Sequence, residues 1–252
     1  MAFAVGLVGG LLSGVFGIGG GIVLVPLLGL LLGLSQKDAQ GVTLAVLLLP
    51  IGLPAVLAYR ERVAIPWRLV ATVIGGFVAA VGPGAWLATR MDGRLLRAVF
   101  AGMVVAVAVR MWRQASGGGA SPRRSDAPAP SVWNGLWIGA VGGALAGLLG
   151  IGGGIVMIPL LVAAMHLDQR EAQAVSLAVM LPPVGLPGVL AYARAQGSLP
   201  WAVMVLVAAG FAVGALLGAR VAVGARTVTL SRAFALFLVA VAARLAWTSL
   251  RG

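Results

Sequence analysis

Residues 14–28 read GVFGIGGGIVLVPLL, and residues 147–161 read GLLGIGGGIVMIPLL. Without gaps, residues 14–59 align with residues 147–192 at 28 identities in 46 positions. A match of this length does not arise by chance, and repeats of this kind mark a duplicated structural unit. The chain is therefore a tandem duplication.

The duplication defines the domain organisation. The first repeat covers residues 1–113 and the second covers residues 132–252, and Gly76-Phe77 in the first matches Gly210-Phe211 in the second. Between the repeats, residues 114–131 read QASGGGASPRRSDAPAPS. A segment of this composition buries too little apolar surface to order itself, so we predict a flexible linker.

The composition predicts a multi-pass membrane protein. Of the 252 residues, 61% are hydrophobic and 10% are charged, and the mean hydropathy is +1.07. Soluble domains carry roughly a quarter charged residues, so a soluble protein is excluded. The net charge of +12 comes from basic residues between apolar segments, a pattern that suits anionic lipid headgroups and argues against nucleic-acid binding.

Each repeat contains five apolar segments, all predicted to be helical. Three per repeat approach the roughly 20 residues needed to span a bilayer. The other two are short and are joined by a GIGGG turn, as in a re-entrant hairpin or a pair of tilted short helices. The long segments are residues 38–59, 66–89, 94–113, 171–192, 199–223 and 228–250, and the short ones are residues 2–16, 22–34, 132–149 and 155–166.

An odd number of crossings per repeat would insert the two copies with opposite orientations. Inverted repeats with broken helices are a transporter architecture in which the substrate binds near the membrane midplane. The alternative, one long broken span over residues 2–34, would give parallel repeats. The distribution of basic residues leaves the orientation open.

The two glycine turns are predicted to bind an anion. Gly19, Gly20 and Gly21 precede one helix, and Gly152, Gly153 and Gly154 precede its repeat equivalent. The first N–H groups of a helix lack intrahelical partners and carry a partial positive charge, and glycine lets a ligand approach the backbone. The alternative interpretation is that these glycines only allow close helix packing.

Paired polar residues and prolines accompany these turns. Gln40 and Thr43 correspond to Gln173 and Ser176 in the second repeat, and each pair shares a helix face. They either complete the anion's coordination or form interhelical hydrogen bonds. Mid-segment prolines are predicted to bend the helix, either statically or as hinges. These prolines are Pro50, Pro54, Pro183 and Pro187.

Aromatic residues at the segment ends are predicted to lie in the interfacial aromatic belt of the membrane. They are Tyr59, Tyr192, Trp67 and Trp201.

The duplicated GxGGG-x(4)-P element, followed by a helix with a small hydroxylated residue and a Pro/Gly-rich stretch, resembles the sulfite exporter TauE/SafE family, also called the 4-toluene sulfonate uptake permease family. The resemblance extends over essentially the whole chain. It implies a multi-pass transporter of the bacterial inner membrane for sulfite, organosulfonates or related sulfur-containing organic anions. Within that family the substrate and the direction of transport vary.

Together these features predict a carrier that binds a small anion between the two glycine turns and opens alternately to each side. An anion channel is an alternative that the sequence leaves open. An intramembrane enzyme is disfavoured, because the sequence places no His/Asp/Glu or Ser/Lys constellation at membrane depth. We predict no metal and no cofactor, and a homodimer remains open.

Overall fold

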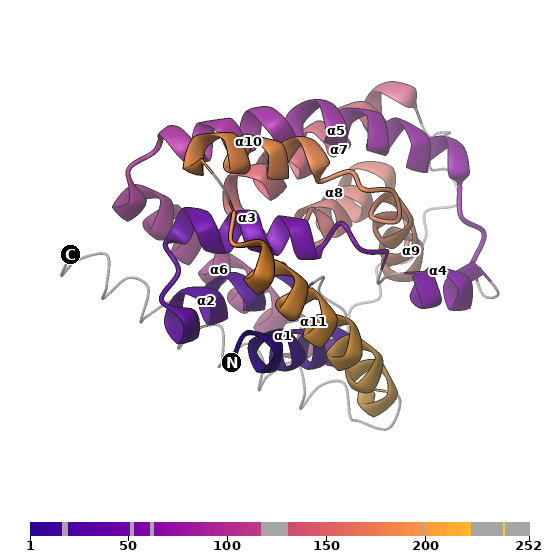
Figure 1. Cartoon of the computed structure of the whole chain (residues 1–252). Coiled ribbons are helices and arrows are strands. Elements are labelled where there is room, and N and C mark those ends of the chain that lie inside the picture. The colour runs from indigo at the N-terminus through magenta and orange to yellow at the C-terminus, as the bar shows by residue number, and fades with distance from the viewer. Residues whose placement is uncertain are drawn as a thin grey trace.

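The computed structural model describes residues 1–16, 20–50, 53–60, 63–116, 131–197, 199–222 and 239. Every regular element among them is a helix, which confirms the all-α prediction (Figure 1). In chain order the helices are α1 (Ala2–Phe16), α2 (Gly21–Leu32), α3 (Gln36–Val46), α4 (Leu53–Arg60), α5 (Trp67–Arg90), α6 (Gly93–Ser116), α7 (Val132–Leu149), α8 (Gly154–Met165), α9 (Gln169–Val179), α10 (Leu186–Gln196) and α11 (Trp201–Ala222). The predicted last segment, residues 228–250, falls outside the described residues apart from 239, and so does most of the predicted linker.

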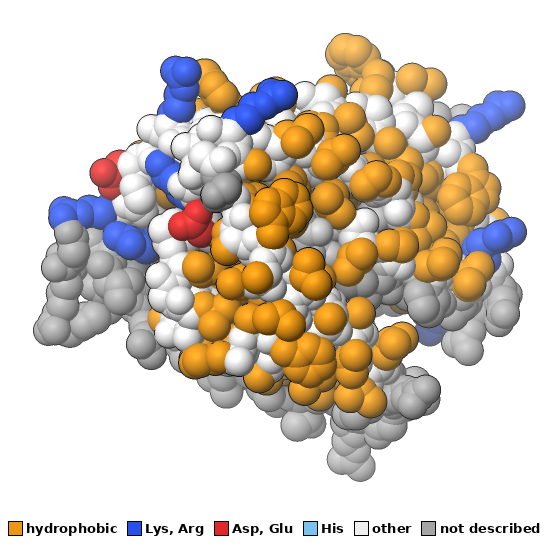
Figure 2. Space-filling view, in the orientation of Figure 1, with side chains coloured by type: hydrophobic (Ala, Val, Ile, Leu, Met, Phe, Trp, Pro, Cys, Tyr) orange, Lys and Arg blue, Asp and Glu red, His pale blue; other side chains and the backbone are white. Residues whose placement is uncertain are grey.

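Three of the described helices are long and apolar enough to cross a membrane: Trp67–Arg90, Val132–Leu149 and Trp201–Gly218. Three shorter helices are also apolar, namely Ala2–Val15, Gly21–Leu32 and Gly154–Met165. On the face drawn in Figure 2, hydrophobic side chains cover the middle, whereas Lys and Arg side chains lie toward the left and right margins. This distribution is typical of a protein whose middle faces lipid.

The third segment of each repeat is not one continuous span, and that expectation is wrong. Residues 38–59 divide into α3 and α4, and residues 171–192 divide into α9 and α10. The first half of each ends before a proline, at Val46 ahead of Pro50 and at Val179 ahead of Pro183. Proline lacks an N–H and excludes its preceding residue from the helical region, so the helix stops instead of bending through.

The two repeats are packed into each other. The first helix of each repeat lies against the fourth segment of the other, so that α1 packs on α11 and α7 packs on α5. The two halves of each broken third segment also contact the other repeat, because α3 packs on α10 and α4 packs on α9. The buried hydrophobic residues therefore form two clusters, each containing side chains from both repeats.

Glycines bring the paired long helices to backbone contact. A Cβ on Gly139 of α7 would collide with the carbonyl oxygen of Val73 in α5, and one on Gly6 of α1 would collide with that of Val207 in α11. Small residues at such positions let membrane helices approach closely and gain packing energy. The same contact occurs at repeat-equivalent places in both helix pairs.

We predict that Gly139→Leu lowers the free energy of unfolding by about 1–3 kcal/mol or more, because the side chain must separate α7 from α5. Heat-induced unfolding of the purified protein in detergent measures this. Gly102→Leu is the matched control, since a Cβ on Gly102 of α6 meets nothing within 4 Å. Equal losses in the two variants would contradict the proposed tight contact.

Candidate anion-binding site at the glycine turns

The two glycine turns lead into helices that lack side-chain caps. Gly20 precedes α2 with φ +57°, in the left-handed region that favours glycine, and Gly153 precedes α8. Neither α2 nor α8 has a side-chain hydrogen bond at its N-cap. By contrast, Ser35 caps α3, and Asp168 caps α9 in a complete capping box. The N–H groups of Val23 and Val156 donate to the carbonyl oxygens of Gly20 and Gly153 at 3.1 Å. In each helix this leaves the N–H groups of the first two residues as the ones that a ligand could reach.

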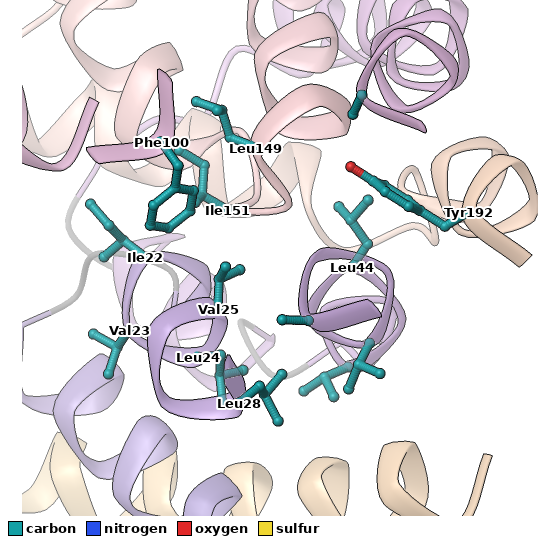
Figure 3. Packing of buried hydrophobic residues seen from close by; sticks show 14 of the residues in the cluster. Ile22, Val23, Leu24, Val25, Leu28, Leu44, Phe100, Leu149, Ile151 and Tyr192 are labelled. Atoms are coloured by element: carbon teal, nitrogen blue, oxygen red, sulfur yellow. The ribbon is translucent and has the colours of Figure 1, made fainter. Parts of the chain in front are cut away.

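The glycine turns of the two repeats meet in the interior. A Cβ on Gly21 would collide with the backbone of Ile151, which lies in the other turn. Ile151 is buried, and Figure 3 shows it among Ile22, Phe100 and Leu149. Two helix N-termini are thus brought to one place from positions 133 residues apart in the sequence. Gly19 lies outside the described residues.

A phenylalanine from the opposite repeat covers each turn. A Cβ on Gly20 would collide with the ring of Phe211 in α11, and one on Gly153 would collide with the ring of Phe77 in α5. Both rings are almost fully buried. In this conformation Gly20 and Gly153 are therefore closed to solvent.

Gln40 and Thr43 of α3 carry unpaired polar atoms, and Gln40 lies beside the second turn. Both side chains are 0% exposed, and neither Nε2 of Gln40 nor Oγ1 of Thr43 has a hydrogen-bond partner. Gly150, in the second turn, packs directly on Gln40, because its Cβ would lie 2.6 Å from Cα of Gln40. Unpaired buried polar atoms are costly, so these two side chains are candidates for binding a polar ligand. Nε2 of Gln36 and Nε of Arg97 are unpaired as well.

The second-repeat pair lies in an equivalent place. Ser176 is 3% exposed, and its Oγ is 3.3 Å from the point that a Cβ on Gly154 would occupy. Gln173 is half-buried, and its Oε1 accepts a hydrogen bond of 2.9 Å from the hydroxyl of Tyr59. Ser176 is therefore adjacent to the glycine turn, and Gln173 is held by α4 of the other repeat.

Two tyrosines belong to this network, and assigning Tyr192 to the aromatic belt is wrong. Tyr192 is 0% exposed, and its hydroxyl lies 2.8 Å from Oε1 of Gln40 and 2.9 Å from the carbonyl oxygen of Gly147 at the end of α7. Figure 3 shows its hydroxyl pointing from α10 into the core. The repeat alignment could have revealed this role, because Tyr59–Gln173 and Tyr192–Gln40 are equivalent pairs.

The prolines lie at the breaks and starts of the half-helices. Pro50 and Pro183 are exposed in the breaks that follow α3 and α9, and Pro187 lies in the first turn of α10. Pro54 is in the first turn of α4. They shape the half-helices that carry Gln40 and Tyr192.

In the described part of the chain no cluster of three His, Asp or Glu side chains is arranged to hold a metal ion. The donors at the glycine turns are backbone N–H groups, an amide and hydroxyls. Such a set can bind an oxyanion through several hydrogen bonds, each contributing about 1.5–3 kcal/mol when the acceptor is charged.

Comparison with known proteins agrees with this architecture. The chain is 30% identical over 198 residues to a probable membrane transporter protein of Methanocaldococcus jannaschii, covering 76% of this chain and 71% of that protein. It is 28% identical to probable membrane transporter proteins of Haemophilus influenzae, with 96% of each chain covered, and of Xylella fastidiosa strain Temecula1, with 99% of this chain and 92% of that protein covered. No solved structure matches the chain.

The model of the family described as "Sulfite exporter TauE/SafE" matches residues 2–245, nearly the whole sequence. The duplicated glycine turns, the apolar helices and this match lead to one conclusion: the chain belongs to the sulfite exporter TauE/SafE family of membrane transporters.

Proposed function

We propose that this transporter carries a small oxyanion, sulfite or an organosulfonate, bound where the two glycine turns meet near the membrane midplane. The observation that carries the proposal is the buried, unpartnered amide of Gln40, which packs against the second glycine turn, with the unpartnered hydroxyl of Thr43 on the same helix face. An oxyanion would accept hydrogen bonds from these groups, from Ser176 and from the first two N–H groups of α2 and α8.

Inverted repeats are part of this proposal, and two observations support them. In Figure 1, α5 runs from right to left and its equivalent α11 runs from left to right. Within each pair the helices are parallel, because Gly6 and Gly10 of α1 meet Val207 and Phe211 in the same order along α11. The first helices of the two repeats then also run in opposite directions, and the two helix N-termini approach one site from opposite sides.

Alternating access would convert the closed site into open ones. Phe77 and Phe211 cover the two turns in equivalent positions, so displacement of one ring at a time would expose the anion to one side. Relative movement of the half-helices in the broken third segments would accompany this opening. We place this multi-pass protein in the inner membrane of a bacterial cell.

Counterflow in proteoliposomes tests the function. Purified protein is reconstituted into vesicles preloaded with sulfite, and uptake of radiolabelled sulfite is followed with sulfate, acetate and taurine as competitors. We expect saturable uptake that is faster when the vesicles contain sulfite, because the binding site of a carrier returns to the outer side faster with substrate bound than empty. Uptake without such stimulation would point to a channel, and the absence of uptake for every sulfur oxyanion would contradict the proposed substrate class.

A further inference from the structure

A separate groove lies on the outer surface between α5 and α10. Its volume is about 740 Å³, within the range of about 300–1,000 Å³ typical of ligand sites. It lies apart from the glycine turns, since none of its lining residues belongs to them. The lining combines two arginines, a tryptophan and a threonine with small apolar residues: Gly82, Pro83, Trp86, Thr89, Arg90, Pro187, Ala191, Arg194 and Ala195.

One end of the groove is cationic. The helices α5 and α10 are parallel here, because Gly82 packs on Pro187 while Arg90 and Arg194 come later in the same groove. Both arginines are exposed. The guanidinium of Arg90 lies 4.2 Å from the ring centre of Trp86, a cation–π contact that fixes one face of the group and leaves its in-plane donors free.

The other charged groups nearby do not neutralise this end. Nζ of Lys37 donates to the carbonyl oxygen of Thr89 at 2.7 Å and so adds a third cation beside the groove. The adjacent carboxylate, Asp38, accepts hydrogen bonds of 2.6 Å from Nε2 of Gln196 and Oγ of Ser35. A second carboxylate, Asp92, follows Arg90 by two residues and accepts a hydrogen bond of 2.7 Å from the backbone N–H of Arg94. Three cations therefore outnumber two carboxylates, each of which already has a neutral donor.

The other end of the groove is apolar. Gly82 lies eight positions, and Pro83 and Pro187 seven positions, before the arginine of the same helix, which is about 10–12 Å at 1.5 Å per residue. Trp86 stands between the two ends and is 51% exposed, as is typical of a residue at the boundary of headgroups and hydrocarbon.

We infer that this groove binds an anionic phospholipid, whose phosphate lies between Arg90 and Arg194 and whose acyl chain lies over Pro83, Pro187 and Ala191. A soluble phosphate would satisfy the arginines but not the apolar half, which favours the lipid. Ala191 directly precedes Tyr192, so the lipid would brace the helix that reaches Gln40. This inference does not depend on which substrate is carried.

Native mass spectrometry of the full chain tests it by titration with phosphatidylglycerol, with phosphatidylcholine as the neutral lipid and inorganic phosphate as the soluble anion. We expect the double variant Arg90→Gln/Arg194→Gln to bind phosphatidylglycerol about tenfold or more weakly. The matched control, Arg68→Gln/Arg170→Gln, loses the same charge from exposed sites outside the groove and should bind normally. Equal weakening in both would overturn the inference in favour of diffuse attraction.

A third variant, Ala191→Phe, fills the apolar half and separates the two anion sources. We expect it to weaken phosphatidylglycerol binding while the response to inorganic phosphate stays unchanged. Wild-type lipid affinity in Ala191→Phe, or equal affinity of the wild-type chain for the two lipids, would overturn the inference. Thermal unfolding of each variant confirms that it is folded before its binding is compared.

Discussion

Gly153→Ala is expected to weaken sulfite binding by about a hundredfold or more. Gly153 has φ −75°, which alanine adopts without strain, so the backbone of the turn is retained. Its new methyl group would collide with the ring of Phe77 and would lie 2.9 Å from Cε of Met157. Whichever way the ring moves, the methyl group also holds the anion away from the N–H groups at the start of α8, and losing two charge-assisted hydrogen bonds costs about 3–6 kcal/mol.

Two further variants separate binding from packing. Gly185→Ala is the matched control, because Gly185 is the N-cap of α10, has φ −77° and would place its Cβ 3.4 Å from Leu48. Phe77→Leu in the Gly153→Ala background removes the crowded ring. Isothermal titration with sulfite should show normal binding for the control and no recovery in the double variant. Recovery would mean that the glycine serves helix packing alone.

Much of the fold is predictable because the duplication provides an internal comparison. Two helices with identical glycine turns must occupy equivalent environments, and the predicted segments over residues 2–16 and 132–149 coincide with α1 and α7. The breaks in the third segments are harder to predict, because the sequence stays apolar across Pro50 and Pro183 while the helix ends before each proline. Hydropathy reports burial, whereas the helix break follows from a missing N–H.

The sequence does not reveal which side chains the site residues contact. Helical periodicity gives the face on which Gln40 lies but not the helix opposite that face, which is α10 of the other repeat. The position of Tyr192 at a segment end therefore predicts an interfacial residue, although the structure buries it against Gln40. Phe77 and Phe211 occupy equivalent positions in the repeat alignment, but the sequence does not show that their rings cover the glycines.

Gln40→Leu is the second substitution with a large expected effect, and it should uncouple stability from transport. The wild-type side chain is 0% exposed and leaves Nε2 unpaired, which disfavours the folded state in the absence of a ligand. Leucine removes that unpaired donor at similar volume, while the hydroxyl of Tyr192 keeps the carbonyl oxygen of Gly147 as its partner at 2.9 Å. Thermal unfolding without ligand should be unchanged or shifted upward.

Transport by the same variant should fall, because the anion loses a donor worth about 1.5–3 kcal/mol, or roughly 10- to 150-fold in affinity. Gln36→Leu is the matched control: its Nε2 is also buried without a partner, on the same helix but one turn away. If only the Gln40 variant loses sulfite counterflow while both retain stability, the unpaired amide is explained by the ligand it binds. Wild-type counterflow in Gln40→Leu would remove Gln40 from the site and leave the glycine turns as the remaining source of donors.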